Sequence, residues 1–461
     1  MSEIPTSVTD EEGNIHVLLP EPLGKGGQGV VLRTRSHGIA VKLVGFGSAG
    51  QDEARQARLR QRLENLRLLP LPAWQLAVPL SMLKDRVGYT MRLLNGMVPI
   101  RNLIAPQGQA GIAAFYAASG GLRRRLVVLA KLADVLARLH AVPLVYGDIS
   151  PNNVFVSEST DDSELWLIDV DNLNYQSDAV VVQTDGFAAP ELATGRMGPS
   201  TLSDAYSFAV LAYLVLAQTH PFFGACVEEG AWDEDDEDRE ALANQGKLPW
   251  IEDADDQSNS PVHGIPGHMV MNPGLRELFQ RAFGAGRSER AARPSMAEWA
   301  EGLQRAAAYT VRCGGCGSSF YVSARHCPFC SAGPEPKFIH MQVHRWDPGI
   351  DDELGVSAIS SKPVWHKILD LESEVHRHVT EPVLAGADDP PVLSVRLVAS
   401  GVAIAPLGGY EVHVVLGKEL RRLEREMILP LPTPGRELCL HFGPRERPHR
   451  LGVLRYYGGA A

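Results

Sequence analysis

The sequence predicts an α+β protein built from several domains, and three observations support that prediction. The chain has 461 residues and is too long to fold around a single hydrophobic core, so two or three domains are expected. Strand-like and helix-like stretches both occur between residues 14 and 308. From residue 334 onward, alternating or apolar runs separated by Gly and Pro are typical of antiparallel β structure.

The composition argues against several classes of protein. Hydrophobic residues make up 44% of the chain and charged residues 21%, as in ordinary globular proteins. The net charge of −11 disfavours general nucleic-acid binding, which needs a basic surface. No apolar run approaches the ~18 residues of a membrane helix, and residues 1–13 are too acidic and polar for a signal peptide. We therefore expect a cytoplasmic protein with a flexible N-terminus at residues 1–13, binding neither nucleic acid nor membrane.

A glycine-rich segment opens the first domain. Gly24, Gly26 and Gly29 fit G-x-G-x-x-G within LGKGGQGVV, and Val31 follows two residues later. Glycines let the backbone approach phosphates because no Cβ is in the way. No helix follows at once, which disfavours a dinucleotide-binding fold. We predict a phosphate-binding loop; a flexible hairpin tip is the alternative.

The next predicted strand contains Ala40-Val41-Lys42 and places an ammonium group under this loop. Residues 51–69 are rich in helix formers, and Glu53 and Glu64 lie about three turns apart on one face. Either glutamate can reach Lys42, and Glu64 has the better spacing. Solvated side chains without a role are the alternative for the lysine and for the glutamates.

Val87–Leu94 (VGYTMRLL) indicates a buried strand that leads into a connector. Backbone groups in this connector can hydrogen-bond a purine base, and Met91 and Leu93 are the candidates.

The stretch from Tyr146 to Asp171 brings together three side chains with oxygen atoms, Asp148, Asn153 and Asp169. They stand at the two ends of a predicted hairpin, Val154–Val156 and Leu165–Ile168. A carboxylate beside an amide suits a hard cation such as Mg²⁺. The remaining carboxylate, Asp148, can accept a proton from an attacking hydroxyl, which is the geometry of phosphoryl transfer. Turn residues without a function are the alternative.

Further motifs surround this stretch. A predicted core-facing helix precedes it, with apolar residues at helical spacing: Leu126, Leu129, Ala130, Ala133, Leu136 and Ala137. Three segments follow it: TDGFAAPEL (184–192), SDAYSFAVLAYLVLA (203–217) and RAARPSM (290–296).

In this order, the motifs resemble those of bacterial eukaryotic-type (Hanks-type) serine/threonine protein kinases over roughly residues 14–307. The resemblance implies a bilobal protein-kinase-like α+β fold over residues 14–308, with an N-lobe at 14–94 and a C-lobe at 95–308. It also implies ATP and Mg²⁺ in the cleft and a protein substrate. The implied nucleotide site comprises Gly24, Gly26, Gly29, Val31, Ala40, Lys42, Met91 and Leu93.

The resemblance assigns roles to single residues. Asp148 falls on the catalytic base, and Asn153 and Asp169 fall on the magnesium ligands. Lys42 would grip the phosphates and Glu64 would hold Lys42. Three bracing residues match as well: Glu191 of the A-P-E segment, its arginine partner Arg293, and Asp204, which braces the catalytic loop.

More narrowly, ENLRLL, the short catalytic segment and the trailing cysteines resemble kinases of tellurite-resistance-like systems. Those kinases accompany a phosphatase and a von Willebrand A-type protein, and the resemblance implies both as partners.

Three positions depart from the family pattern. Tyr146-Gly147 replaces His-Arg, Ser150 replaces the lysine near the transferred phosphate, and Asp171 replaces the last glycine of D-F-G. Charges near a transition state contribute strongly to rate, so losing that lysine favours slow transfer or a nucleotide-binding pseudokinase scaffold as the alternative. A small-molecule phosphotransferase is a further alternative, because Gly147-Asp148 with its later Asn resembles antibiotic and choline phosphotransferases; those enzymes lack the A-P-E segment and the Asp204/Arg293 pair.

Four cysteines predict a zinc knuckle at residues 309–333. Cys313, Cys316, Cys327 and Cys330 form CxxC-x10-CxxC, which suits a closed tetrahedral Zn²⁺ site. Redox or disulfide chemistry is the alternative. Cys226 and Cys439 are isolated and are expected to be buried apolar residues.

Residues 334–461 indicate an antiparallel β domain, a sandwich or a small barrel, for which we expect partner recognition. Its histidines, His376 and His378 among them, lack a metal-ligand spacing and are expected on solvated strand faces. The acidic block Asp233–Asp238 indicates a solvated loop or a docking site for a basic partner.

Overall fold

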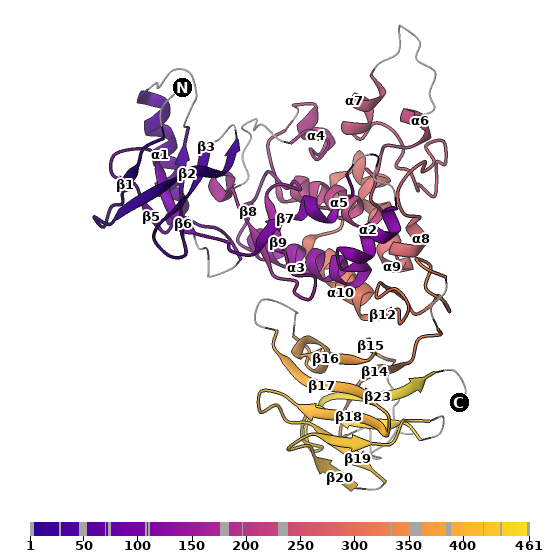
Figure 1. Cartoon of the computed structure of the whole chain (residues 1–461). Helices are drawn as coiled ribbons and strands as arrows, with labels where there is room; N and C mark the ends of the chain where they lie inside the picture. The colour runs from indigo at the N-terminus through magenta and orange to yellow at the C-terminus, as the bar shows by residue number, and fades with distance from the viewer. Residues whose placement is uncertain are drawn as a thin grey trace.

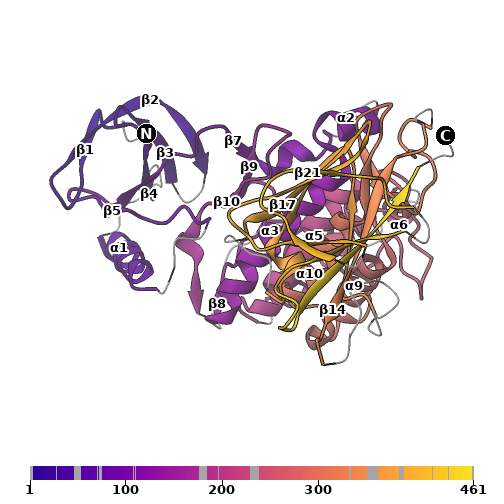
Figure 2. The same cartoon turned by 90° about the horizontal axis from the view of Figure 1, so that it is seen from below.

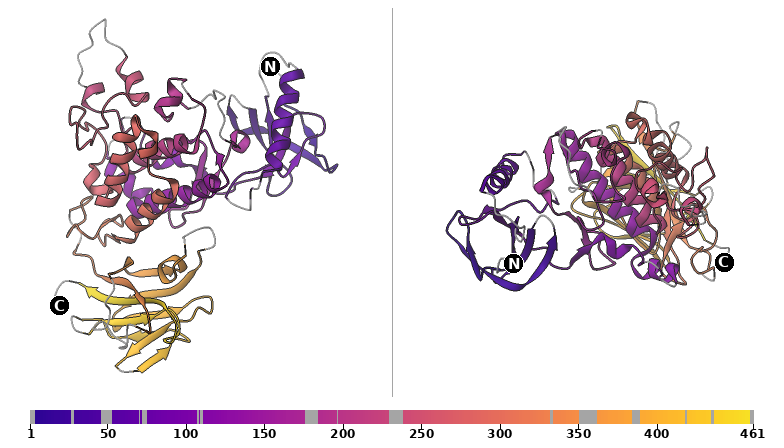
Figure 3. Two further views of the ribbon diagram at one scale, coloured as in Figure 1. Left: turned by 180° about the vertical axis from the view of Figure 1, so that it is seen from behind. Right: turned by 90° about the horizontal axis from the view of Figure 1, so that it is seen from above.

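The structure is a computed structural model, and it describes most of the chain. The described residues are 4–26, 29–45, 53–69, 71, 75–106, 108, 111–175, 184–195, 197–228, 238–331, 334–349, 362–383, 389–417, 419–433 and 436–458. They form an N-terminal sheet with one helix, a helical region, and a C-terminal β region. The N-terminal sheet and the C-terminal β region lie on different sides of the helical region (Figures 1 and 3).

The N-terminal sheet has six antiparallel strands in the order β1-β2-β3-β4-β6-β5. Their bounds are β1 Ser7–Thr9, β2 Ile15–Gly26, β3 Gly29–Thr34, β4 Ile39–Val44, β5 Ser81–Met82 and β6 Gly88–Arg92. The sheet is strongly curved, and α1 (Glu53–Arg67) lies outside it (Figure 2). Successive side chains of a strand point to opposite faces of the sheet, and this places Leu18, Leu32 and Val41 in a small core on one face. The expectation of a flexible N-terminus at residues 1–13 is corrected for residues 7–9, which form β1 and pair with β2.

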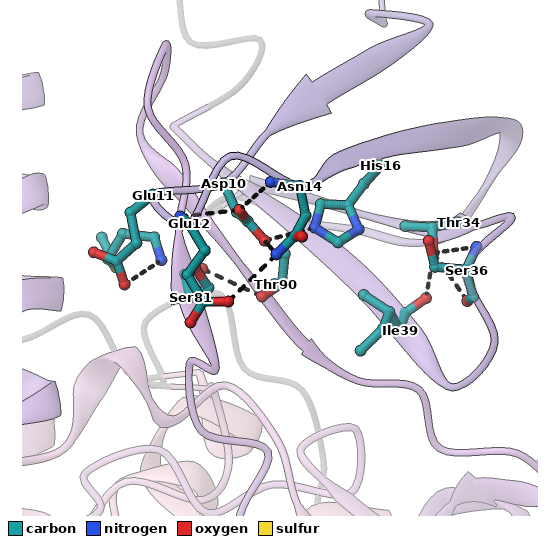
Figure 4. A network of polar contacts seen from close by, with 11 residues as sticks. Asp10, Glu11, Glu12, Asn14, His16, Thr34, Ser36, Ile39, Ser81 and Thr90 are labelled. Carbon is teal, nitrogen blue, oxygen red and sulfur yellow. Dashed lines mark hydrogen bonds and ion pairs between the residues drawn. The ribbon is translucent and has the colours of Figure 1, made fainter.

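A polar network fixes the first turn of this sheet (Figure 4). The Asp10 carboxylate accepts the Asn14 backbone N–H at 2.8 Å and lies 2.9 Å from Nε2 of His16. Burial raises the pKa of the Asp10 carboxyl, but the hydrogen bonds from His16 and Asn14 outweigh it and lower that pKa to about 2. The ionised carboxylate therefore stabilises the folded N-terminal turn.

We predict that Asp10→Asn destabilises the protein at neutral pH by about 2 kcal/mol, the scale of hydrogen bonds to a charged group. Because the folded pKa lies below the ordinary 3.8, this stabilisation is complete well above pH 4 and is lost as the pH falls toward 2. Denaturant unfolding at pH 7 and pH 3, with the exposed Asp85→Asn as the matched control, measures it. An Asp10→Asn deficit that is equal at both pH values would contradict the prediction.

The helical region packs around α5 (Thr201–Ala217), which is buried on nearly all sides. A mostly apolar helix that is buried on nearly all sides forms the centre of a domain. The other elements are β7 Met97–Pro99, α2 Ile112–Ala118, α3 Gly121–Ala141, β8 Leu144–Val145, β9 Val154–Ser157, β10 Leu165–Leu167, β11 Asn174–Tyr175, α4 Pro190–Ala193, α6 Ala225–Glu228, α7 Arg239–Asn244, α8 Gly267–Val270, α9 Pro273–Phe283 and α10 Met296–Ala308, with short 3-10 turns at Ile100–Leu103, Val170–Asn172 (η2), Ala285–Arg287 and Arg290–Ala292.

Two predictions for this region are confirmed. Helix α3 buries Leu126, Leu129 and Leu136 on its core-facing side. Strands β9 and β10 form the expected hairpin, with Leu165 opposite Val156 and Leu167 opposite Val154.

The chain then forms a small hairpin and two larger sheets. The hairpin pairs β12 (Thr310–Arg312) with β13 (Ser319–Tyr321). The larger sheets have the orders β15-β14-β23-β22-β19-β20 and β16-β17-β18-β21. Their elements are β14 Phe338–Trp346, β15 Trp365–Leu369, β16 Glu372–His376, α11 Arg377–Thr380, β17 Pro391–Val398, β18 Gly401–Pro406, β19 His413–Leu416, β20 Glu419–Arg422, β21 Met427–Leu429, β22 Leu438–His441 and β23 His449–Tyr457. Both sheets contribute side chains to one core, Met341 and Leu454 from the first and Val395 and Ile404 from the second, so this region is a sandwich.

Three smaller expectations need correction or fall outside the structure. Cys439 is buried as expected, but Cys226 is only half-buried. His378 does not simply face solvent, because its Nδ1 lies 2.5 Å from the Asp389 carboxylate. Residues 233–237 of the acidic block lie outside the described residues, and Asp238 caps α7.

Candidate active site

The loop between β8 and β9 carries the first part of the site. The Asp148 carboxylate accepts hydrogen bonds from the Asn153 amide and from the Thr184 hydroxyl, each at 2.8 Å. The Asn153 amide also donates to the backbone carbonyl of Asp148 at 2.9 Å. The structure therefore brings Asp148 and Asn153 together, as their short separation along the chain predicts, and adds Thr184 from the segment before the A-P-E motif.

Asp169 ends the hairpin on the other side. Its backbone has a left-handed conformation, with φ of 57°. A non-glycine residue there is uncommon and is found where surrounding structure fixes it. The Asp169 carboxylate contacts the Lys42 ammonium, which comes from strand β4 of the N-terminal sheet. Strand β4 and the end of the hairpin thus meet through this ion pair.

Lys42 has a second carboxylate partner that the sequence analysis does not assign. Its Nζ lies 2.6 Å from Oδ2 of Asp171, and the hydroxyl of Tyr89 donates to the other oxygen, Oδ1. Burial lowers the pKa of the Lys42 ammonium, but the attraction of Asp171 and Asp169 outweighs it and raises that pKa. Lys42 is 3% exposed and stays charged.

The predicted pairing of Glu64 with Lys42 is not seen, and this corrects the sequence analysis. Helix α1 turns Leu63 and Leu66 into the protein, so Glu64 lies off the buried stripe and is exposed. Within the described part of the chain, Glu64 makes no ion pair and Lys42 contacts Asp169 and Asp171 instead. Glu53 begins α1, but its side chain lies outside the described residues.

Strand register places the remaining nucleotide candidates close to Lys42. Gly24 lies opposite Val31, and Gly26 lies opposite Gly29. Val31 is also the register partner of Lys42.

Gly29 needs to be glycine, because a Cβ there would lie 2.2 Å from the Leu43 carbonyl oxygen. The tip of the loop, residues 27 and 28, lies outside the described residues.

The backbone groups of the candidates around the connector are not all free to hydrogen-bond a purine. Ala40 pairs with Met91 in the β4–β6 ladder. The backbone N–H of Leu93 already donates to the Gly38 carbonyl at 2.8 Å, so that atom is not free for a purine. The expectation that a backbone group of Leu93 binds a purine therefore cannot rest on its N–H group.

Two sets of buried contacts brace the loop between β8 and β9 and the A-P-E segment, as the resemblance implies. The Asp204 carboxylate accepts the backbone N–H groups of Tyr146 and Gly147 at 2.7 and 2.9 Å. Arg293, with a fully buried side chain, makes two 2.8 Å hydrogen bonds to Glu191. These contacts fix the loop between β8 and β9, our candidate catalytic loop, and the A-P-E segment to α5 and its neighbours.

Sequence reasoning missed Tyr89 and His220. Tyr89 is the register partner of Lys42 across β4 and β6, so strand pairing is the signal that places its hydroxyl near the lysine. His220 holds the carbonyl of Gly186 at 2.9 Å, and burial lowers the pKa of its imidazole to about 4. A neutral His220 therefore anchors the segment before A-P-E, for which no local pattern exists.

The four cysteines form a second site beside β12 and β13. Their sulfur atoms all lie within 4.8 Å of one another, with 3.7 Å between Cys313 and Cys330 and between Cys316 and Cys327. A tetrahedral zinc with thiolate ligands sets its sulfurs roughly 3.8 Å apart, so the four side chains fit a zinc ion. Zinc would stabilise this small segment, whose own core is limited.

We expect about one zinc per chain in freshly purified protein, because the four cysteine thiolates can fill all four positions around one tetrahedral zinc ion. Elemental analysis measures it, and Cys327→Ser should lower both the zinc content and the melting temperature. Cys226→Ser, at an isolated half-buried cysteine, is the matched control and should keep the metal. Parent protein without zinc would contradict the prediction.

Known proteins resemble part of this chain. The chain matches no protein-family model. It is 36% identical over 110 residues to the serine/threonine-protein kinase pkn2 of Myxococcus xanthus, covering 22% of this chain and 13% of that protein. It is 26% identical over 232 residues to the serine/threonine-protein kinase PkaA of Streptomyces coelicolor, covering 46% and 40% respectively. A stretch of 182 residues is 26% identical to the serine/threonine-protein kinase kin-29 of Caenorhabditis elegans, covering 36% and 20%.

The chain therefore has distant, partial homology to serine/threonine protein kinases, bacterial ones included. It spans less than half the length of these relatives. Among the described residues, no helix is long and apolar enough to span a membrane.

Proposed function

We propose that the protein is a protein kinase that transfers the γ-phosphate of ATP to serine or threonine hydroxyls of a partner protein. The observation that carries the proposal is the buried Lys42 ammonium held at Asp169, next to a loop in which Asn153 and Thr184 orient Asp148. A buried cation beside a candidate metal-binding carboxylate, next to a positioned base, is the set of groups that phosphoryl transfer requires.

Each side chain has a stated task in this proposal. Asp148 orients the attacking hydroxyl and accepts its proton, because two hydrogen bonds hold its carboxylate in place. Lys42 binds the phosphates under Gly24, Gly26 and Gly29. Asn153 and Asp169 would hold Mg²⁺, which supplies charge neutralisation at the phosphates.

The domains proposed with this function are an N-lobe at 14–94, a C-lobe at 95–308, a zinc knuckle at 309–333 and a β domain at 334–461. As partners we propose a protein substrate, and from the sequence resemblance a von Willebrand A-type protein with a cognate phosphatase. The β domain is our candidate for contacting them.

A nucleotide-binding pseudokinase is the second candidate, and Ser150 favours it. This residue is 1% exposed and stands where the related kinases place a lysine, so a positive charge near the transferred phosphate is missing. A small-molecule phosphotransferase has less support, because the Arg293–Glu191 pair braces an A-P-E segment that such enzymes lack.

We predict that Asp169→Asn and Lys42→Met each slow phosphotransfer by on the order of 10²-fold or more, because preorganised charges at the phosphates are lost. Radiolabelled ATP with Mg²⁺ and generic protein acceptors measures the rate. Asp161→Asn, an exposed carboxylate, is the matched control. Thermal unfolding should show that Asp169→Asn stays folded.

Two outcomes of this experiment separate the candidates. An Asp169→Asn variant as fast as the parent would exclude this active site. A parent that binds Mg·ATP but transfers no phosphate would support the pseudokinase.

We further predict that activity does not depend on phosphorylation of the segment between Asp169 and Glu191. In kinases switched that way, an arginine beside the catalytic Asp pairs with the added phosphate; here the position is Gly147, which has no side chain. Of the possible acceptors, Tyr175 is exposed, Thr184 is engaged with Asp148, and Ser177 lies outside the described residues.

Phosphatase treatment and Ser177→Ala should therefore each leave the rate within about twofold, whereas Thr184→Ala should slow it by removing one hydrogen bond to the base, worth about 1 kcal/mol. A loss of rate on dephosphorylation that Ser177→Ala reproduces would overturn this prediction.

A further inference from the structure

Two carboxylates meet the Lys42 ammonium, and they differ in their surroundings. The Asp169 side chain is 27% exposed, whereas the Asp171 side chain is 8% exposed. Asp171 lies in η2 (Val170–Asn172), directly after the hairpin that ends at Asp169. Asp169 can therefore turn toward solvent and a metal, while Asp171 faces into the protein.

Both oxygens of Asp171 have a donor. Oδ2 accepts from Lys42 at 2.6 Å, and Oδ1 accepts from the Tyr89 hydroxyl. Tyr89 is 1% exposed and packs with Leu63 of α1 and with Met82. A buried carboxylate is stable only where its charge is paired and its lone pairs are satisfied, and this one meets both conditions.

Among the side chains of α1 that the structure describes, none contributes a carboxylate to Lys42. The Glu64 side chain is exposed, and the helix face toward Tyr89 is occupied by Leu63. The counter-charge for Lys42 comes instead from a residue 129 positions later, across the junction between the N-terminal sheet and the hairpin.

We propose that Asp171 is the fixed counter-ion of Lys42, taking the place of a carboxylate from α1, and that it is a positioning residue of the nucleotide site. Asp171 keeps Lys42 in place when Asp169 turns to a metal, so Lys42 is never left buried and unpaired. The orientation of Lys42 then depends on the hairpin and on Tyr89, and not on the placement of α1. This inference rests on the proposed function, because it assigns Lys42 to nucleotide phosphates.

The test compares Mg·ADP affinity, measured by calorimetry on the full chain, with kcat and KM for ATP. We expect Asp171→Asn to weaken Mg·ADP binding and to lower kcat, each by about tenfold or more, because removing one partner of a buried pair is costly. Glu64→Gln, which tests the competing helix carboxylate, and Asp161→Asn, the matched surface control, should each stay within about twofold, as exposed charges contribute little.

A double-mutant cycle shows whether Asp171 acts through Lys42. In a Lys42→Met background, Asp171→Asn should cause no further loss of Mg·ADP affinity, because its task is gone. An equal loss in both backgrounds would overturn the proposal. ADP binding without Mg²⁺ adds a second check: if the loss disappears when the metal is absent, Asp171 is a metal ligand and the proposal is wrong.

Tyr89→Phe covers the case in which Asp171→Asn does not fold. It keeps both charges and removes only the hydroxyl that fixes Asp171, so we expect a smaller loss of affinity, about threefold, in the same direction. Unchanged binding in Tyr89→Phe together with a loss in Glu64→Gln would identify the helix carboxylate as the counter-ion and overturn the proposal. A parent that binds Mg·ADP but transfers no phosphate would refute the proposed function, while the affinity comparison would still decide the role of Asp171.

Discussion

The buried ammonium of Lys42 is the constraint on which the arrangement of the site depends. A lysine that is 3% exposed is tolerated only where opposite charges replace water around it. Those charges come from Asp169 and Asp171, which follow strand β10. The N-terminal sheet and the hairpin of the helical region must therefore meet, and their junction is where we propose that a nucleotide binds.

The other half of the site is held by contacts that leave the catalytic loop little freedom. Asp204 from α5 binds two successive backbone N–H groups of the loop, and Arg293 fixes Glu191 from a fully buried position. Because α5 lies in the centre of the largest core, the loop that it binds is held by a closely packed, rigid part of the protein. Asp148, Asn153 and Thr184 are thus supported by packing as well as by their own hydrogen bonds.

The cysteine cluster and the β sandwich are joined to the same helical region. Arg123 of α3 donates to both carboxylate oxygens of Asp370, at 3.1 and 2.8 Å, and to the Thr310 hydroxyl at 2.8 Å. Phe329, beside the cysteines, stacks on Tyr116 of α2 with ring centroids 5.4 Å apart. A partner bound to the sandwich would therefore act on a unit that is firmly connected to α3, the helix that precedes the catalytic loop.

The sequence by itself determined the features that depend on local spacing. The hairpin from β9 to β10, the buried face of α3, the close approach of Asp148 to Asn153 and the grouping of four cysteines all follow from periodicity or from short separations along the chain. The tertiary structure alone decided which carboxylate pairs with Lys42, that the Leu93 N–H is occupied, and that His378 meets Asp389. The physical reason is that helix periodicity places Glu53 and Glu64 on one face but does not fix which way that face turns. Packing of Leu63 and Leu66 sets the rotation of α1, and the counter-ion of Lys42 then comes from 129 residues away.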